Sequence, residues 1–355
     1  MKTPYISISL EKIEHNAKII TDLCKLYDVS VAGITKGTLG NPKVAEAMIR
    51  GGVKWIGESR LDNIERLKLG GINVPFLLIR SPNKSDIKRV VTISDISLNT
   101  EYDIIEELSQ ESIRQNKVHN IIIMVDTGDL REGVWPQDLI PLIRDVKKMK
   151  GVNILGLGTN LLDLNGIIPT FENNKYFVDI AEEAEEKCKI KFEYLSAGNS
   201  GSLNLLNSGN LPERINHFRI GEGILLGREP IKREAFLCTY QDAFILYGEI
   251  IEKKIKPSMP IGEAGQDAFG NKPIFEDRGI MTRIILNMGR QDINLKGLTP
   301  CNEKLEIIGA SSDHLILDSS MEPDLNIGDK IGFNVNYAAM LASMTSPFVD
   351  KVFIS

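Results

Sequence analysis

The chain has 355 residues, a formal net charge of −6, and a composition that is 42% hydrophobic and 25% charged. This length is enough for one large domain and a smaller one, each with its own buried core. Basic residues are dispersed among acidic ones, which excludes the concentrated positive surface of a nucleic-acid-binding or membrane-surface protein.

The amino-terminal segment MKTPYISISLEKIEHN lacks the apolar core and cleavage site of a secretion signal, and no later run is apolar for long enough to cross a bilayer. Four cysteines are scattered without a CxxC pair, which argues against a disulfide framework or a zinc site. We therefore expect a soluble cytoplasmic protein that binds no metal.

Short β-branched apolar runs alternate with longer amphipathic runs up to about Pro230. The short runs predict eight strands, at 30–36, 53–56, 74–79, 95–98, 120–125, 153–158, 192–196 and 217–221. The amphipathic runs predict helices, among them 11–27, 42–50, 101–111, 136–149 and 173–187. Apolar strands separated by helices favour a closed parallel (β/α)8 barrel, and a doubly wound open sheet is the alternative.

After this region the pattern changes to β-rich runs, at 243–253, 279–286, 305–308, 315–317, 330–335 and 349–354. These runs predict a C-terminal antiparallel β domain. The expected organisation is a barrel over 11–230, a β domain over 231–355, and a strand within 1–10 that pairs with the β domain.

Active sites of such folds gather where the strands end, and nearly every one of these positions carries a reactive side chain. The positions are Lys36, Glu58, Arg80, Asp126 with Arg131, Asn160, Asn199 with Ser200, and Arg219 with Gly221. Lys36 ends a buried run beside a Gly-rich turn, so its amine can lose hydration and attack a carbonyl carbon. The alternative is a solvated surface lysine.

The loops after the last two predicted strands suit an anion. The run SAGNSGS, at 196–202, offers hydroxyls and a helix start, and RIGEG, at 219–223, allows close backbone approach. Together they predict a phosphate site, although an ordinary capped turn is the alternative for the first loop. A lysine able to form a Schiff base and a phosphate site in one barrel mouth indicate pyridoxal 5'-phosphate (PLP).

Several motifs carry a resemblance to a known family. Ile6, Ser7 and Leu10 before a helix with Asn16, then Lys36, DTGDLREG, the Asn199-Ser200 turn and Arg219-Ile220-Gly221, resemble the alanine racemase-like, fold-type III PLP enzymes. The segments MVDTGDLREG, LLGRE, KPSMPIGEAGQDAFGNKP, GRQD and GASSDHLILD are similar to its ornithine racemase branch. The resemblance runs from about Tyr5 to Phe353 and implies an amino-acid racemase.

The resemblance also implies roles for three residues. Lys36 matches the lysine that holds the cofactor and then acts as one of two acid/base groups at Cα. Arg219 matches the arginine that hydrogen-bonds the pyridine nitrogen, keeps it unprotonated and limits side reactions. Arg131 matches an arginine near the cofactor phenolate and the substrate carboxylate, the alternative being a surface charge.

Racemisation requires a second group on the opposite face of Cα. Alanine racemases place a tyrosine in a turn of the partner subunit's β domain, and the corresponding turn here, GRQD at 289–292, has none. The candidates are His314, Asp313 and Tyr337, with His314 preferred because imidazole titrates near neutral pH. A histidine satisfied within a β-turn is the alternative.

The sequence differs from alanine racemases at two further places that are expected to contact the cofactor. Asn160 replaces a histidine that backs the ring, and the tyrosine that helps to bind phosphate is missing from 37–41. Cofactor binding is therefore expected to depend on polar and small residues: Asn199, Ser200, Gly221 and Tyr337, with Thr345 or Ser346 as further phosphate ligands.

Acidic side chains in the β-domain loops suit a dibasic amino acid, with ornithine favoured over lysine and arginine: Asp267, Glu276, Asp277, Asp292 and Asp313. We expect a homodimer whose active sites are completed by the partner's β domain. The alternatives are a non-catalytic PLP-binding protein, to which the run IGESR is similar but which lacks a β domain, and a fold-type III decarboxylase or aldolase.

Overall fold

The computed structural model describes residues 2–272 and 274–354. Residues 1, 273 and 355 lie outside the described residues. They fall, in that order, in the expected 1–10 segment, in the run KPSMPIGEAGQDAFGNKP and at the end of the expected β domain. The chain forms two compact units, Leu10–Gln241 and Met1–Ser9 with Asp242–Ser355. Residues 231–241 belong to the first unit, where the Asn16 side chain accepts from the Tyr240 backbone N–H at 2.7 Å.

The first unit is a closed barrel of eight parallel strands, listed in chain order as β2 (Ser30–Ile34), β3 (Trp55–Glu58), β4 (Phe76–Leu78), β5 (Ile96–Asn99), β6 (His119–Met124), β7 (Val152–Gly158), β8 (Tyr194–Gly198) and β9 (His217–Ile220). Strand β9 closes the ring by pairing with β2, with Ala32 opposite Arg219. Bulky apolar side chains such as Leu77, Leu98 and Ile122 form a core inside it. The predicted barrel is confirmed and the open-sheet alternative is wrong.

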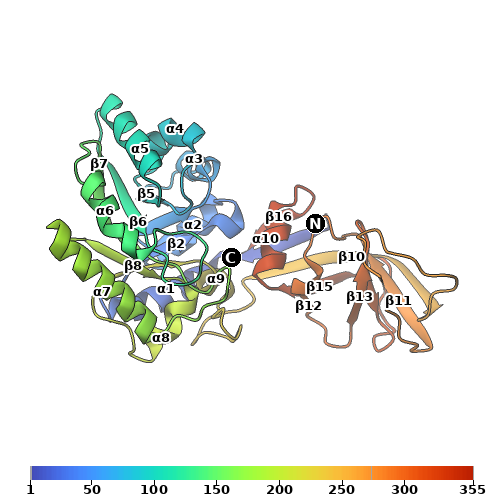
Figure 1. The fold of residues 1–355 in the computed structure, drawn as a ribbon. Helices are drawn as coiled ribbons and strands as arrows, with labels where there is room; N and C mark the ends of the chain where they lie inside the picture. The colour runs from blue at the N-terminus through green and yellow to red at the C-terminus, as the bar shows by residue number, and fades with distance from the viewer. Residues whose placement is uncertain (1, 273, 355) are drawn as a thin grey trace. The chain divides into compact units, whose positions relative to one another are not determined.

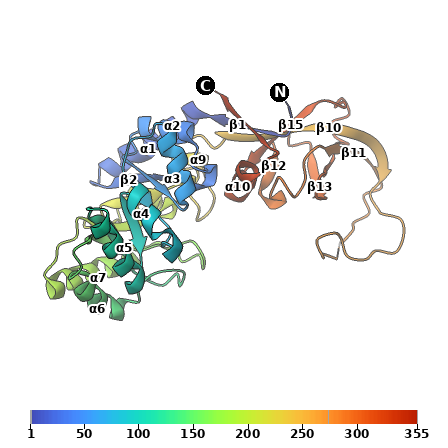
Figure 2. The same cartoon turned by 90° about the horizontal axis from the view of Figure 1, so that it is seen from above.

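Helices surround these strands in both ribbon views (Figures 1 and 2). They are α1 (Leu10–Lys25), α2 (Pro42–Arg50), α3 (Leu61–Leu69), α4 (Ile87–Ile93), α5 (Tyr102–Arg114), α6 (Pro136–Val146), α7 (Phe171–Cys188), α8 (Leu203–Asn207) and α9 (Glu222–Leu226). The helix predicted over 11–27 ends at Lys25, and Asp28 in the turn that follows has a φ of 55°. No helix of the described residues is long and apolar enough to span a membrane.

The second unit is a sheet with the strand order β12 (Leu298–Pro300), β15 (Lys330–Val335), β10 (Phe244–Pro257), β11 (Ile280–Leu286), β14 (Leu315–Asp318) and β13 (Glu306–Ala310). All of these pairs are antiparallel, as predicted. Strand β1 (Tyr5–Ser9) pairs antiparallel with β10 and parallel with β16 (Asp350–Ile354). The amino-terminal strand thus completes the C-terminal sheet.

Two features of this unit differ from the prediction. The β1–β16 pair is parallel, and a helix that was not predicted, α10 (Tyr337–Thr345), follows β15. The Asn336 side chain caps this helix by accepting from the Ala339 N–H at 3.0 Å. An apolar core that includes Phe244, Leu286 and Phe333 is fully buried in the unit.

Candidate active site

Lys36 lies immediately beyond the carboxyl end of β2. The strand ends at Ile34, two residues earlier than predicted, because Lys36 begins a short 3-10 helix, η1 (Lys36–Thr38). The N–H of Thr35 donates to the Gly57 carbonyl at 3.2 Å, and the Thr38 hydroxyl donates back to the Thr35 carbonyl at 3.0 Å. These bonds fix the backbone around a half-buried lysine at the edge where barrel active sites form.

Glu58 ends the neighbouring strand and is fully buried. Burial raises the pKa of its carboxyl group, while hydrogen bonds from Asn63, Thr35 and Ser59 and the charge of Lys36 act in the opposite direction. Arg80, which was also expected at this edge, is exposed after β4. The structure therefore places Glu58, rather than Arg80, in the buried surroundings of Lys36.

Arg219 has a buried guanidinium that connects three strands. Its Nη1 donates to the Ser196 carbonyl at 2.8 Å and to the Ser196 hydroxyl, and its Nη2 donates to the Thr159 carbonyl at 2.6 Å. Burial lowers the pKa of Arg219 to about 10, so the group stays protonated at neutral pH. Carbonyls of the middle of β8 and of the residue after β7 thus hold a fixed cationic donor.

Two predicted asparagines lie beside this guanidinium. The Asn160 side-chain oxygen accepts from Arg219 Nη2 at 3.5 Å and from Asn199 Nδ2 at 3.3 Å. Asn199 also donates to the Leu161 carbonyl at 2.6 Å. The structure therefore brings Asn160, Asn199 and Arg219 together, as the sequence analysis expected.

The loops after β8 and β9, which carry Ser200 and Gly221, are joined to each other. The Ser200 hydroxyl accepts from the Gly223 N–H at 3.0 Å, and the Asn199 side chain accepts from the Gly201 N–H at 2.8 Å. The hydroxyl of Ser202 is buried and has no hydrogen-bond partner among the described residues. An orphaned hydroxyl in a loop of small residues is suited to a polar ligand.

Arg131 lies in the loop after β6 and is bound by two carboxylates. Its guanidinium donates to both oxygens of Glu132 and to Asp163 in the loop after β7. Burial lowers the pKa of Arg131, but hydrogen bonds and charges from these carboxylates outweigh burial and raise it. Asp126 shapes the loop by accepting from the Gly128 N–H at 2.8 Å.

The expected second-base residues lie in the β unit. Asp313 and His314 are exposed in the turn between β13 and β14, and Asp313 accepts from Gln291 Nε2 at 2.8 Å. The N–H of Arg290 donates to the Ser311 carbonyl at 2.9 Å, and the His314 N–H donates to the Ser311 hydroxyl at 3.1 Å. The turn 289–292 therefore packs directly against the turn that carries His314.

Some β-unit candidates have structural partners of their own. Asp292 is buried and accepts from the Ser346 hydroxyl at 2.9 Å, so neither side chain is available as an exposed ligand. The Thr345 hydroxyl donates to the Leu341 carbonyl at 2.8 Å. Tyr337 is half-buried as the first residue of α10. Among the acidic loop residues, Asp313 is exposed and adjoins the turn 289–292.

His217 was not identified from the sequence, and Ser196 was placed only in the loop expected to bind phosphate; both residues are buried beside Arg219. His217 and Arg219 are separated by one residue on β9, so their side chains point to the same side of the strand. The alternation of side chains along a strand was the sequence pattern that could have identified His217. A histidine two residues before an arginine on one strand indicates a contact between neighbouring side chains on the same face.

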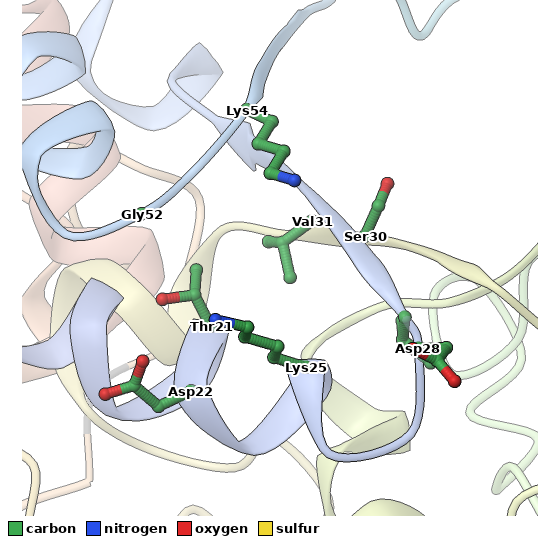
Figure 3. Close-up of a pocket in the computed structure, with 9 residues that line it drawn as sticks. Thr21, Asp22, Lys25, Asp28, Ser30, Val31, Gly52 and Lys54 are labelled. Atoms are coloured by element: carbon green, nitrogen blue, oxygen red, sulfur yellow. The ribbon is translucent and has the colours of Figure 1, made fainter.

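A surface depression of about 480 Å³ lies away from these residues (Figure 3). It is lined by residues from α1, the start of β2 and the segment before β3, including Lys25, Ser30 and Lys54. These are the amino-terminal ends of the strands, opposite the edge that carries Lys36. No cluster of the described residues is arranged to hold a metal ion.

Comparison with known proteins gives two results. The model of the alanine racemase N-terminal domain matches residues 8–229. A lysine racemase from Thermotoga maritima is 40% identical over 99% of both chains, and an ornithine racemase from Acetoanaerobium sticklandii is 39% identical over 98% of this chain and 99% of its own. This chain belongs to the alanine racemase family.

The family's fold also extends over the whole chain. Alanine racemase from Bartonella henselae, solved with covalently bound pyridoxal phosphate, aligns with a TM-score of 0.76 at 18% identity and covers 100% of both chains. The amino-acid racemase class that the resemblance implied is therefore confirmed by family membership.

Proposed function

We propose that the protein is a PLP-dependent racemase of a free dibasic amino acid, with ornithine as the favoured substrate and lysine as the next. The observation that carries the proposal is the placement of Lys36 and Arg219 at the carboxyl ends of β2 and β9, which are neighbouring strands of the barrel. The ornithine and lysine racemases that resemble this chain over nearly their whole length support the substrate class.

The residues at this edge fit the chemistry of PLP. Lys36 offers an amine for an aldehyde carbon, and Arg219 is a buried, fixed hydrogen-bond donor for a ring nitrogen. Asn160 and Asn199 lie beside Arg219, and Ser200 and Gly221 lie in joined loops that suit a phosphate. When bound, PLP supplies an electron sink that acidifies the Cα–H bond of the amino acid.

In this proposal two groups of the protein move protons at Cα. Lys36 takes or returns the proton on one face, and His314 acts on the other, with Asp313 and Tyr337 as the other candidates. Arg131 binds the substrate carboxylate when that group displaces the carboxylates of Glu132 and Asp163.

The distal ammonium of a dibasic substrate needs an anionic partner. Asp313 is exposed beside the turn 289–292, which makes it the strongest of the proposed acidic contacts. We further propose that the protein is a homodimer in which the partner's β unit completes each site. The cytoplasmic location expected from the sequence stays a prediction.

The test follows colour and proton exchange in the same preparations. Wild type and Lys36→Ala are incubated with PLP, and visible absorption is recorded. Borohydride reduction and peptide mapping then locate the modified lysine. Deuterium entry into Cα of L- and D-ornithine, lysine, arginine and alanine is measured in heavy water.

Wild type is expected to bind PLP at Lys36 and to exchange both ornithine enantiomers faster than alanine. Modification of a lysine other than Lys36 would contradict the cofactor site. Colour without exchange would favour a non-catalytic PLP-binding protein, and carbon dioxide or aldehyde release would favour a decarboxylase or aldolase. Activity per subunit that persists in a diluted monomer would contradict the shared dimer site.

A further inference from the structure

Glu58 is a fully buried carboxyl group to which the proposed reaction assigns no role. It is the last residue of β3, which pairs in parallel with β2 so that Gly57 lies opposite Ile34. Glu58 therefore lies beside the segment that leads from β2 to Lys36. A buried ionisable group is costly to the fold unless contacts stabilise it, so its surroundings are informative.

Three hydrogen bonds are donated to this carboxyl group, all by neutral donors. The Thr35 hydroxyl donates to Oε1 at 2.7 Å, and Oε2 accepts from Asn63 Nδ2 at 3.0 Å and from the Ser59 N–H at 3.1 Å. Both oxygens act as acceptors, which is the arrangement that suits the ionised form. The contacts thus tie this carboxyl group to Thr35, the residue that precedes Lys36.

The orientation of Asn63 is fixed from its other side. Its side-chain oxygen accepts from Arg66 Nη1 at 3.0 Å, so its amide nitrogen faces Glu58. The loop after Lys36 also packs closely on this residue, because a Cβ added to Gly40 would lie 2.7 Å from Asn63 Cβ. The first turn of α3 and the Lys36 loop therefore enclose the carboxyl group together.

The charges of the two residues act on each other. Burial raises the pKa of Glu58, and the positive charge of Lys36 is among the influences that lower it. The two residues thus lie close enough in the fold for their charges to interact.

We propose that Glu58 is a positioning residue for Lys36, which holds the preceding backbone through Thr35 and thereby sets the reactivity of the lysine amine. The proposal rests on the proposed function for its catalytic meaning, since there Lys36 binds the cofactor and moves the proton. The contacts and their effect on the amine exist without the cofactor.

The test is competitive labelling of lysines with acetic anhydride in the full-length protein prepared without PLP. Mass spectrometry of peptides across about pH 6 to 10 follows the unprotonated fraction of the Lys36 amine. Glu58→Gln keeps the shape of the side chain and removes its charge. We expect Lys36 labelling near neutral pH to rise about three- to tenfold, because the variant removes the carboxyl group that interacts with the charge of Lys36.

A matched control is Glu65→Gln, which removes a carboxylate of α3 that pairs with Arg89 at 3.0 Å. It should leave the Lys36 profile unchanged. Thr35→Val removes the tether and should shift the profile in the same direction by less, while Thr35→Ser, which keeps the hydroxyl, should restore it.

A Lys36 profile in Glu58→Gln that overlays the wild-type profile overturns the proposal. If that variant does not fold, identical profiles for Thr35→Val and Thr35→Ser overturn it instead. A shifted profile in a protein that gains no visible absorption with PLP supports the Glu58 contact and removes only the proposed function, so the two failures are distinguishable.

Discussion

Nδ1 of His217 lies 2.7 Å from the hydroxyl oxygen of Ser196 in the buried interior of the barrel. The same hydroxyl accepts from Arg219 Nη1, so its own hydrogen is free to be donated to His217. Nδ1 is then the acceptor and Nε2 carries the proton, although Nε2 has no hydrogen-bond partner among the described residues. A neutral histidine thus supports the serine that orients Arg219.

Replacing Ser196 by alanine should loosen Arg219. The variant removes the acceptor of one guanidinium contact and leaves His217 Nδ1 buried without a partner, while the Ser196 carbonyl contact remains. Because an unsatisfied buried group costs about 1–3 kcal/mol, we expect a lower free energy of unfolding by roughly that amount. Chemical denaturation measures it, and PLP titration should show weaker binding. Unchanged values in both measurements would contradict a supporting role.

Two buried histidines should make the protein acid-sensitive. Burial lowers the pKa of His217 to about 3 and that of His119 to about 4, whereas an unfolded histidine titrates near 6.5. Between these values the unfolded state binds more protons than the folded state. The contribution of the two neutral histidines to the free energy of unfolding is therefore fully present above about pH 6.5. It falls as the pH drops, by about 1.4 kcal/mol per pH unit for each histidine.

The measurement is the free energy of unfolding of wild type and His119→Asn between about pH 5 and pH 7.5. The difference between the two proteins cancels the contributions of other groups. The variant should lose less stability on acidification because one of the buried histidines is gone. Parallel curves for the two proteins would show that His119 does not contribute to the acid sensitivity.

The loop that carries Arg131 should tolerate alanine at Gly128 better than at Gly133. Both glycines have positive φ angles, 130° and 148°, so both substitutions strain the backbone. A Cβ at Gly133 would also lie 2.3 Å from the Asp126 nitrogen, whereas nothing lies within 4 Å of one at Gly128. We expect Gly133→Ala to unfold at a lower temperature and to have a higher KM. Equal effects would show that backbone strain alone matters.

The second-base assignment predicts an asymmetric defect. Replacing His314 by glutamine should reduce the interconversion of ornithine enantiomers about 10²- to 10⁴-fold, the usual contribution of an acid or base group. Deuterium should still enter Cα of one enantiomer, because Lys36 can act on its own face. Asp313→Asn is the companion variant, and it should mainly raise the KM for ornithine. Equal loss of exchange from both enantiomers in His314→Gln would argue against a role on one face.

Much of the barrel was predictable because its strands and helices are encoded locally. Lys36 could be recognised from its place after a buried strand, and Asn160, Asn199 and Arg219 from theirs. The helix α10 was missed because a short apolar segment after a strand has no distinctive period. The burial of Asp292 was missed because its partner Ser346 is distant in the sequence.

The sequence alone determined the order of strands and helices, since apolar periodicity records which face of each element avoids water. It also determined which reactive side chains stand at strand ends. Only the tertiary structure decided their partners. The Ser196 and Thr159 carbonyls that accept from Arg219 lie on or just after other strands than Arg219, and the Thr35 hydroxyl that donates to Glu58 follows a neighbouring strand. Hydrogen bonds depend on distance and direction between atoms, and only the closed barrel brings these groups within reach.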